Sequence, residues 1–299
     1  MMATSMKNSA TIPTACATCQ ARIDGLCEGY GPDVLHVIAG HKSGDRRLKA
    51  GQDLLSLGEP CDAIYNLVDG WVFLYDLLED GRRQILDFAM PGAVLGFHPT
   101  NGRVMTYGVQ ALTDAVVCVI PHKSLAPLTR QRPEIGLRIA GLMSRDRSLT
   151  FAHLTSMGRQ SARERVAHLL LELFVRCRSR WPGHRIEEMH LPLTQEHIGD
   201  ATGLTGVHVN RVLGDLKKDG IVTFSYRRLS ILDPDKLVDA AGVNSEVLHS
   251  WIRRTPPGRG TEGDPFVGVS PLRLTTAPRS HGSEAHTAPG RAVAARCLA

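Results

Sequence analysis

The sequence predicts an α+β chain in which a β-barrel or sandwich of short strands precedes one long helix and a C-terminal winged helix-turn-helix. Three observations predict this order. Short apolar runs recur between turn signals over residues 34–123. From Ser124 onward the apolar spacing becomes that of a helix. Further along, two capped segments are joined by a short turn that contains a glycine.

The composition is that of a soluble globular protein. The 299 residues suffice for two domains, and 42% hydrophobic with 22% charged residues is an ordinary balance. A net charge of +5 permits a nucleic-acid partner without requiring one. No apolar run reaches the roughly 20 residues that span a bilayer, and the first residues lack the apolar core of a signal peptide. We therefore expect a cytoplasmic protein without a membrane partner.

Residues 1–33 form a cysteine-rich segment that we expect to be ordered by whatever its thiols hold. Cys16, Cys19 and Cys27 lie within twelve residues. In a reducing compartment such a group indicates metal or redox chemistry rather than disulfides. With a fourth thiolate, an iron–sulfur cluster and a zinc ion are both possible, and so is a metal-free set of reversible thiols. The spacing alone selects neither the group nor the fourth ligand, for which Cys61 and Cys118 both qualify.

Residues 34–123 carry the strand signals. The runs DAIYNLVDG, WVFLYDLLEDG, RRQILDFAMPG and TDAVVCVIP are short, apolar and bounded by turn residues. Glu79-Asp80-Gly81 lies between two of them and predicts a hairpin turn. Many short strands at this spacing are typical of a barrel or sandwich.

Residues 124–158 predict a long helix that begins near Arg132-Pro133-Glu134. Apolar residues recur along it at heptad spacing, which is typical of a dimerisation seam; they are Ile135, Ile139, Leu142 and Leu149. The same residues would also suit one helix that packs on its own domain. A further helix is expected from Ser161 to Arg178, before the stop signal Trp181-Pro182-Gly183.

Residues 159–240 predict the winged helix-turn-helix. Thr194 caps a helix over residues 195–201 that closes at Gly203, and Thr205 caps a second helix that runs to about Asp219. The alternating stretch IVTFSYRRLSIL then predicts a β wing that turns at residues 226–228.

The second helix would be the recognition helix, whose N-terminal half enters the major groove. Arginine and asparagine side chains read base edges, whereas lysines more often meet phosphates. The candidate DNA-binding residues are Thr205, Val207, His208, Asn210, Arg211, Lys217 and Lys218, with Arg227 and Arg228 on the wing. The alternative is a helical hairpin with a solvated charged face.

Taken together, these segments resemble the CRP/FNR superfamily of transcription regulators over about residues 14–240. The resemblance rests on LGEPCDAIYNLVDGWVFLYDLLEDGRRQILDFAMPGAVLGF, LTDAVVCVIP, RERVAHLLLEL and LTQEHIGDATGLTGVHVNRVL. It implies a jelly-roll barrel like that of cyclic-nucleotide-binding domains, a dimerisation helix and a DNA-binding domain. Its partners would be double-stranded DNA with a two-fold operator, RNA polymerase near the hairpin at residues 79–82, and a second copy of the chain.

Within that family the thiols resemble those of the FNR-type oxygen sensors, which hold a [4Fe-4S] cluster with three N-terminal cysteines and one on a barrel strand. The resemblance implies Cys16, Cys19, Cys27 and Cys118 as ligands, with the cluster favouring dimerisation until oxygen dismantles it. Zinc is the alternative metal.

Two stretches depart from family patterns. The phosphate cassette for cyclic nucleotides would need a Gly-Glu and an Arg-Ser pair, but Gly92 is followed by Ala93 and Arg103 by Val104. We therefore expect no cyclic nucleotide; a haem on His98 is harder to exclude. The recognition-helix pattern E-x-x-S-R reads Val207, Asn210 and Arg211, which leaves the operator sequence open.

The remaining sequence predicts no further activity. Residues 241–299 are rich in Gly, Pro, Ser, Thr and Ala, and we expect a mostly disordered extension. No nucleophile–base pair, paired acids or phosphate loop indicates an enzyme. The alternative from another functional class is a protein-interaction module that zinc stabilises.

Overall fold

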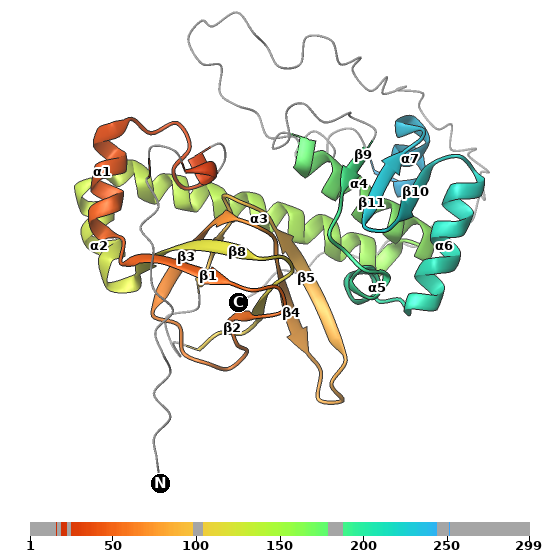
Figure 1. Ribbon diagram of the computed structural model, residues 1–299, viewed down its shortest axis with the longest axis horizontal. Helices are drawn as coiled ribbons and strands as arrows, with labels where there is room; N and C mark the ends of the chain where they lie inside the picture. The colour runs from red at the N-terminus through yellow and green to blue at the C-terminus, as the bar shows by residue number, and fades with distance from the viewer. Residues whose placement is uncertain are drawn as a thin grey trace, which may run out of the picture.

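The computed structural model describes residues 16, 19–22, 25–97, 104–178, 188–243 and 251. Two sheets, a long helix and a smaller α/β unit follow one another along the chain (Figure 1). No helix in these ranges is long and apolar enough to cross a bilayer.

The N-terminal sheets are antiparallel and four-stranded, with the orders β1-β8-β3-β6 and β2-β7-β4-β5. They form a jelly-roll-like pair rather than a closed barrel, and apolar side chains from both sheets share one core. The strands are β1 Gly44–Leu48, β2 Asp53–Leu55, β3 Ala63–Asp69, β4 Val72–Leu77, β5 Arg83–Ala89, β6 Val94–Leu95, β7 Gly108–Ala111 and β8 Ala115–Pro121.

The hairpin turn predicted at residues 79–81 is confirmed between β4 and β5. Leu78 N–H donates to the carbonyl of Arg82 at 2.9 Å, and Gly81 N–H donates to the carbonyl of Leu78 at 2.8 Å. Leu77 and Leu78 stay exposed at the tip of this hairpin.

Residues 32–41 correct one expectation, because they form helix α1 (Pro32–His41) rather than a strand. A proline in the first turn and an acidic residue beside it favour a helix start. Val34, Leu35 and Ile38 then fall on one helical face, and all three are buried. The strand pattern of the later residues of the 34–123 segment had favoured a strand here as well.

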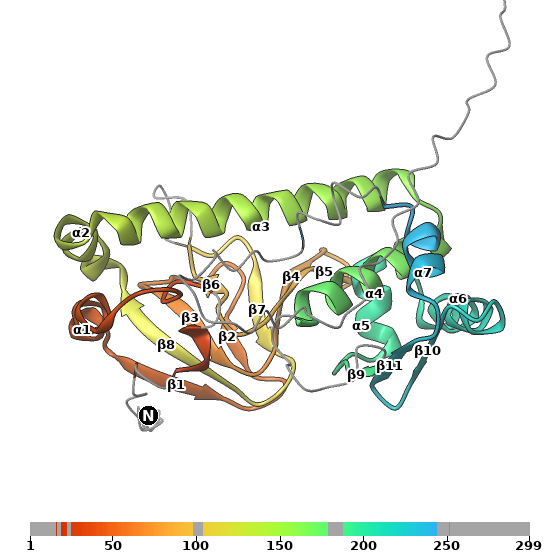
Figure 2. The same cartoon turned by 90° about the horizontal axis from the view of Figure 1, so that it is seen from above.

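Three helices connect the sheets to the C-terminal unit. They are α2 (His122–Gln131), α3 (Pro133–Arg159) and α4 (Ala162–Arg178), so the predicted start near Pro133 and end at Arg178 are confirmed. Figure 2 shows α3 running the length of the molecule, with both sheets on one side of it.

The residues of the predicted dimerisation seam pack within the chain itself. Ile135 and Leu142 are buried against the N-terminal segment and the β3–β8 sheet, and Leu149 is buried against the C-terminal core; their exposed fractions are 0%, 7% and 8%. Ile139 packs beside the first two. A heptad repeat identifies an apolar face of a helix but does not identify the surface that packs on that face. Here the apolar face of α3 packs on other parts of the same chain.

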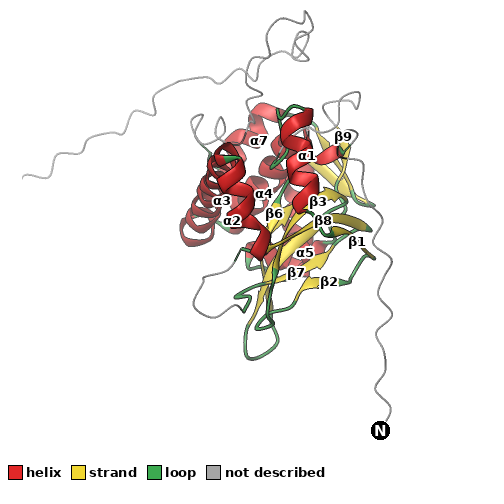
Figure 3. Ribbon diagram, turned by 90° about the vertical axis from the view of Figure 1, so that its left-hand side faces the viewer, coloured by secondary structure: helices red, strands yellow, loops and turns green. Residues whose placement is uncertain are grey.

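The C-terminal unit is the predicted winged helix-turn-helix, in which helices surround a small sheet of order β10-β11-β9 (Figure 1). Figure 3 shows α2 and α3 on one side of the N-terminal strands. Its third strand, β9, has no sequence signal because it spans only three residues. The elements are β9 Glu188–His190, α5 Gln195–Thr202, α6 Gly206–Lys218, β10 Val222–Ser225, β11 Arg228–Ile231 and α7 Pro234–Ala241.

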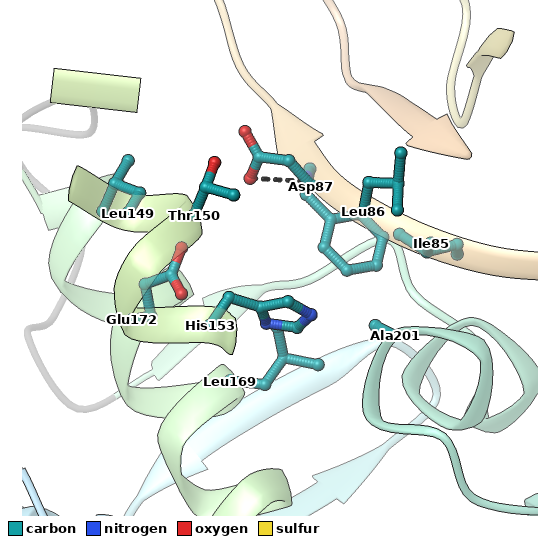
Figure 4. Close-up of a pocket in the computed structure, with 10 residues that line it drawn as sticks. Ile85, Leu86, Asp87, Leu149, Thr150, His153, Leu169, Glu172 and Ala201 are labelled. Carbon is teal, nitrogen blue, oxygen red and sulfur yellow. Dashed lines mark hydrogen bonds between the residues drawn. The ribbon is translucent and has the colours of Figure 1, made fainter. Parts of the chain in front are cut away.

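Strand β5 ties the sheets to this unit. The Arg176 guanidinium of α4 donates to the Asp87 carboxylate at 2.9 Å and to the Phe88 carbonyl at 2.7 Å, and it also pairs with Glu172 at 2.7 Å. Figure 4 shows Asp87, Glu172 and His153 approaching one small cavity from β5, α4 and α3.

A second ion pair joins β5 to the helix-turn-helix itself. Arg83 of β5 pairs with Asp200 of α5 at 2.7 Å, with both side chains about a quarter exposed. Strand β5 therefore contributes two ion pairs between the sheets and the C-terminal helices.

Candidate cysteine site and nucleic-acid interface

The structure brings four thiols together on one side of the first sheet. Cys27 and Cys118 are buried in one apolar cluster, and Cys16 and Cys19 pack against it. Cys118 comes from the middle of β8, while the other three come from the segment before α1. The four cysteines that the resemblance nominated therefore lie in or against one apolar cluster. We call this group of four cysteines the thiol pocket.

The electrostatics of these thiols reflect their closeness. Burial raises the pKa of Cys27 to about 12, and the neighbouring Cys19 and Cys16 push it in the same direction. Burial also raises the pKa of Cys118 to about 12, with smaller upward effects from Cys27 and Cys16. Without a bound cation the buried thiols therefore stay protonated, and a metal that binds them has to displace their protons.

Cys61, the other candidate for the fourth ligand, lies elsewhere. Its side chain is buried in the core between the two sheets rather than in the thiol pocket. Its sulfur lies 3.1 Å from the carbonyl of Ala63 and 3.6 Å from that of Gly96, as a thiol that donates to the backbone does. This placement separates it from the four clustered cysteines.

The thiol pocket is not an assembled site for a single ion. Among the described residues, which include all four cysteines, no three His, Cys, Asp or Glu side chains are arranged to hold one metal ion. The donor set nevertheless suits a thiolate-ligated group, because soft sulfur donors are the ones that iron–sulfur clusters and zinc select.

The cysteine segment packs tightly on the sheet at Gly25. A Cβ at Gly25 would lie 2.2 Å from the carbonyl oxygen of Gly92, so the two backbones touch. From the other side, Arg138 of α3 donates to the carbonyl of Gly25 at 2.8 Å and pairs with Glu28. The segment that carries the thiols is thus bonded to the long helix.

A second bond repeats this link one turn earlier in α3. The hydroxyl of Tyr30 donates to the carbonyl of Glu134 at 3.1 Å. Tyr30 follows Cys27 by three residues, so this hydrogen bond also connects the cysteine segment to the first turn of α3.

The helix-turn-helix is built by the capping residues that the sequence indicated. Thr194 accepts from the backbone N–H of His197 at 3.2 Å, and the His197 ring accepts from the Thr194 N–H in return. Thr205 caps α6 by accepting from the His208 N–H at 3.3 Å. A Cβ at Gly199 would lie 2.5 Å from the carbonyl of Leu204, so the helices cross closely only with glycine there.

The predicted reading face of α6 is free in the described structure. Its apolar side chains, Val209, Val212, Leu213 and Leu216, are buried. The nominated residues lie on the other side and are exposed: Thr205, Val207, His208, Asn210, Arg211, Lys217 and Lys218. Val207 is 75% exposed.

The wing turns where the sequence predicted, at Tyr226 and Arg227, which both have positive φ values. Tyr226 is 97% exposed. Arg228 differs from the expectation, because it pairs with Glu188 on the neighbouring strand β9. It is therefore engaged within the sheet, and sequence reasoning missed this because β9 was not foreseen.

Several expectations lie outside the described residues. They concern His98, Arg103, the N-terminal residues before Cys16, and most of the extension from residue 244 onward. Trp251 is described, and it packs edge-on against His168 of α4 at 4.9 Å between ring centroids.

The outer face of α3 carries apolar side chains that nothing in the described part of the chain covers. We define the outer stripe as the exposed residues of α3 that repeat at alternating spacings of three and four, opposite the buried heptad. They are Leu137, Ala140, Ser144, Arg147, Phe151, Leu154 and Gly158. Leu137, Phe151 and Leu154 are 77%, 59% and 67% exposed.

Comparison with known families matches both halves of the chain. Residues 45–132 match the cyclic nucleotide-binding domain, and residues 164–240 match the Crp-like helix-turn-helix domain. The two matches cover the jelly roll and the winged unit respectively.

Similar individual proteins span most of the chain. The fumarate and nitrate reduction regulatory protein of Vibrio cholerae is 30% identical over 67% of this chain and 79% of that protein. The anaerobic regulatory protein of Pasteurella multocida is 29% identical over 69% and 74%. The solved structure of FixK2 from Bradyrhizobium japonicum aligns with a TM-score of 0.60 and 28% identity, covering 67% of this chain and 98% of that one.

Proposed function

Because the chain belongs to the CRP/FNR superfamily of DNA-binding transcription regulators, we propose that it responds to oxygen through a [4Fe-4S] cluster held by Cys16, Cys19, Cys27 and Cys118. Its relatives are transcription regulators rather than enzymes, which confirms the expectation of a non-enzymatic protein. The observation that carries the proposal is that two of these cysteines are buried in one apolar cluster and the other two pack against it.

Similar proteins named for anaerobic regulation and for fumarate and nitrate reduction support oxygen as the signal. When bound, an iron–sulfur cluster supplies a redox-sensitive group whose stability depends on its thiolate ligands. The chain's own part is to bury those thiols, exclude water from them and connect them to α3.

The connection to α3 supports a route from the thiols to the DNA. Arg138 holds the Gly25 carbonyl and Glu28, and Tyr30 holds the carbonyl of Glu134. A rearrangement of the cysteine segment would therefore break these hydrogen bonds on the inner side of α3. The outer stripe lies on the opposite side of the same turns of α3. A movement of these turns would therefore also move the outer stripe.

The outer stripe supports a homodimer through α3. Alternating spacings of three and four with apolar side chains are typical of paired helices. A two-fold dimer would place two α6 helices one helical turn of DNA apart, and each would read one half of a two-fold operator. The exposed hairpin turn at residues 79–82 is the surface that we assign to RNA polymerase.

Zinc or metal-free thiol chemistry in the same pocket is the second candidate. It is favoured by the donor set alone, which suits zinc as well as iron and sulfide. The family assignment and the DNA-binding unit are unaffected by this choice.

The test is to purify the full chain without oxygen and to assay iron, sulfide and zinc with the visible spectrum. We expect iron and sulfide in equal amounts, about four of each per chain, and a brown absorption that bleaches in air. DNA binding, followed by anisotropy before and after air, should weaken on bleaching. Colourless protein that carries zinc would refute the cluster and support the alternative.

The same samples test DNA binding itself. Affinity should fall steeply with salt, because phosphate contacts release counterions. Binding that is insensitive to salt would contradict the assignment of the exposed face of α6 as the DNA-reading surface.

A further inference from the structure

The wing of the DNA-binding unit ends in a turn whose backbone is strained. Ser225 and Arg228 form the last pair of the β10–β11 ladder, so Tyr226 and Arg227 alone make the turn. Their φ values are 49° and 61°. A two-residue turn with positive φ at both positions favours asparagine followed by glycine. A bulky side chain there costs free energy, because its Cβ crowds the backbone.

The strain is confined to this turn within the part of the chain that the structure describes. Every other positive φ in those ranges, outside the values near ±180°, belongs to a glycine. The surrounding sheet holds the turn in place, because β11 lies between β10 and β9 and the N–H of Leu191 donates to the carbonyl of Arg227 at 2.8 Å. Strained backbone that its surroundings enforce is concentrated at functional sites.

The strained turn presents an aromatic side chain to solvent. Tyr226 is 97% exposed, the highest value among the large exposed apolar and aromatic side chains of the described residues. A single exposed side chain of this kind needs no explanation by itself. Here, however, the ring costs backbone strain and gains no burial in the fold, so its use lies in contact with a partner.

The position of the turn identifies that partner as DNA. Leu191, which bonds to the turn, precedes the Thr194 cap of α5 by three residues, a span of at most about 11 Å. In a helix-turn-helix the first helix crosses the sugar–phosphate backbone while the second enters the major groove. The tip of the wing therefore lies beside the path of the DNA backbone.

We propose that Tyr226 is a DNA-contacting residue, whose hydroxyl donates to a phosphate oxygen beside the half-site that α6 reads. Arg227 is exposed at the same turn and adds a charged contact to the same backbone. Arg228 takes no part, because it pairs with Glu188 inside the sheet. This inference rests on the DNA-reading role of α6 in the proposed function, and it does not depend on the group that the thiols hold.

The test measures the affinity of the full chain, prepared without oxygen, for two labelled duplexes. One duplex has a random sequence, and the other is selected from a random pool for tight binding to the wild-type chain. Tyr226→Phe keeps the ring and the turn and removes only the hydroxyl. Fluorescence anisotropy should show about tenfold weaker binding to both duplexes, because a hydrogen bond to a charged phosphate is lost and phosphates carry no sequence information.

A double variant separates DNA contact from stability. Tyr226→Asn/Arg227→Gly supplies the residue types that this turn favours. Its midpoint of thermal unfolding, followed by circular dichroism, should rise by about 2–4 °C as the strain is relieved. Its affinity for both duplexes should nevertheless fall at least about tenfold. A gain in stability with a loss of binding is the signature of strain that serves a contact.

The arginine of the turn is tested through the salt dependence of binding. Arg227→Gln should reduce the slope of log affinity against log salt by about one per chain. The matched control is Arg130→Gln, because Arg130 is an exposed arginine on α2, at the opposite end of the molecule from α6 (Figures 1 and 2). Neither the affinity nor the slope of this control should change.

Arg211→Ala separates the wing from the reading helix. It should weaken binding to the selected duplex far more than to the random one, because α6 reads base edges. If wild type and Arg211→Ala behave in this way while Tyr226→Phe and the double variant bind as tightly as wild type, the role of Tyr226 is overturned and that of α6 stands. A loss in Tyr226→Phe that is confined to the selected duplex would overturn the phosphate contact. Wild-type protein that binds neither duplex overturns both proposals.

Discussion

At the scale of single residues, the location of each thiol separates a ligand from a structural cysteine. Cys118 and Cys61 are both buried and both raised in pKa by burial. Only Cys118 faces the pocket that holds Cys16, Cys19 and Cys27, whereas Cys61 donates to backbone carbonyls between the two sheets. Burial alone therefore does not distinguish a candidate ligand from a structural cysteine.

Substituting the two cysteines tests this distinction. Cys118→Ala should lose most of the iron, the sulfide and the air-sensitive absorption, because one of four ligands is missing. Cys61→Ala should retain them and lose only some stability, about 1 kcal/mol for a lost thiol contact in a core. Metal and sulfide assays on anaerobic protein check both, and the reverse pattern would make Cys61 the fourth ligand.

At the same scale, the exposed residues of α6 follow directly from the sequence. Helical spacing from the Thr205 cap puts Val209, Val212 and Leu216 on the inner face and leaves Val207 and Arg211 outside. Arg228 could not be predicted in this way, because its partner Glu188 comes from a strand forty residues earlier in the chain.

At the scale of elements, α3 carries a buried apolar face and, opposite it, an exposed stripe that mixes apolar and polar side chains. The buried face is occupied by the chain's own sheets and cysteine segment. The outer stripe has large side chains such as Phe151 and Leu154 in solvent. Both faces repeat at heptad spacing, so periodicity alone could not say which faced a second chain.

Phe151→Glu tests the outer stripe. In a two-fold dimer it would remove two apolar side chains and bring two like charges together. Burial of an aromatic side chain contributes about 1.5–3 kcal/mol, so the dimer dissociation constant should rise at least about tenfold. Sedimentation equilibrium of anaerobic protein measures this.

The matched control for that variant is Ser148→Glu, an exposed residue of α3 outside the stripe. It adds the same charge and should leave the dimer intact. Identical sedimentation of wild type and Phe151→Glu, both dimeric, would place the dimer interface elsewhere.

At the scale of the whole molecule, strand β5 joins the sensing and DNA-binding halves. Arg176 is 6% exposed, as is Glu172, and it also holds Asp87 and the Phe88 carbonyl across the domain boundary. Burial raises the pKa of Glu172, and the Arg176 charge opposes this. The arginine therefore pairs with two carboxylates where the domains meet.

Arg176→Met should therefore destabilise the folded chain strongly. It removes the arginine that pairs with the buried carboxylate of Glu172, at a cost of about 3–5 kcal/mol, and it should lower the midpoint of thermal unfolding measured by circular dichroism. Arg83→Met, which breaks the more exposed pair with Asp200, should cost no more than about 1 kcal/mol. A larger loss in Arg83→Met than in Arg176→Met would show that the buried network is not what couples the domains.

The sequence by itself determined the local features of this protein. Caps at Thr194 and Thr205, the hairpin turn at residues 79–81 and the helix start at Pro133 all depend on residues close together in the chain, where backbone geometry and nearby hydrogen bonds decide. The tertiary structure decided which face of α3 is buried, that Cys118 rather than Cys61 joins the other three thiols, and that β5 docks on α4 and α5. These depend on contacts between distant segments, and a periodic pattern identifies an apolar face without naming the surface that covers it.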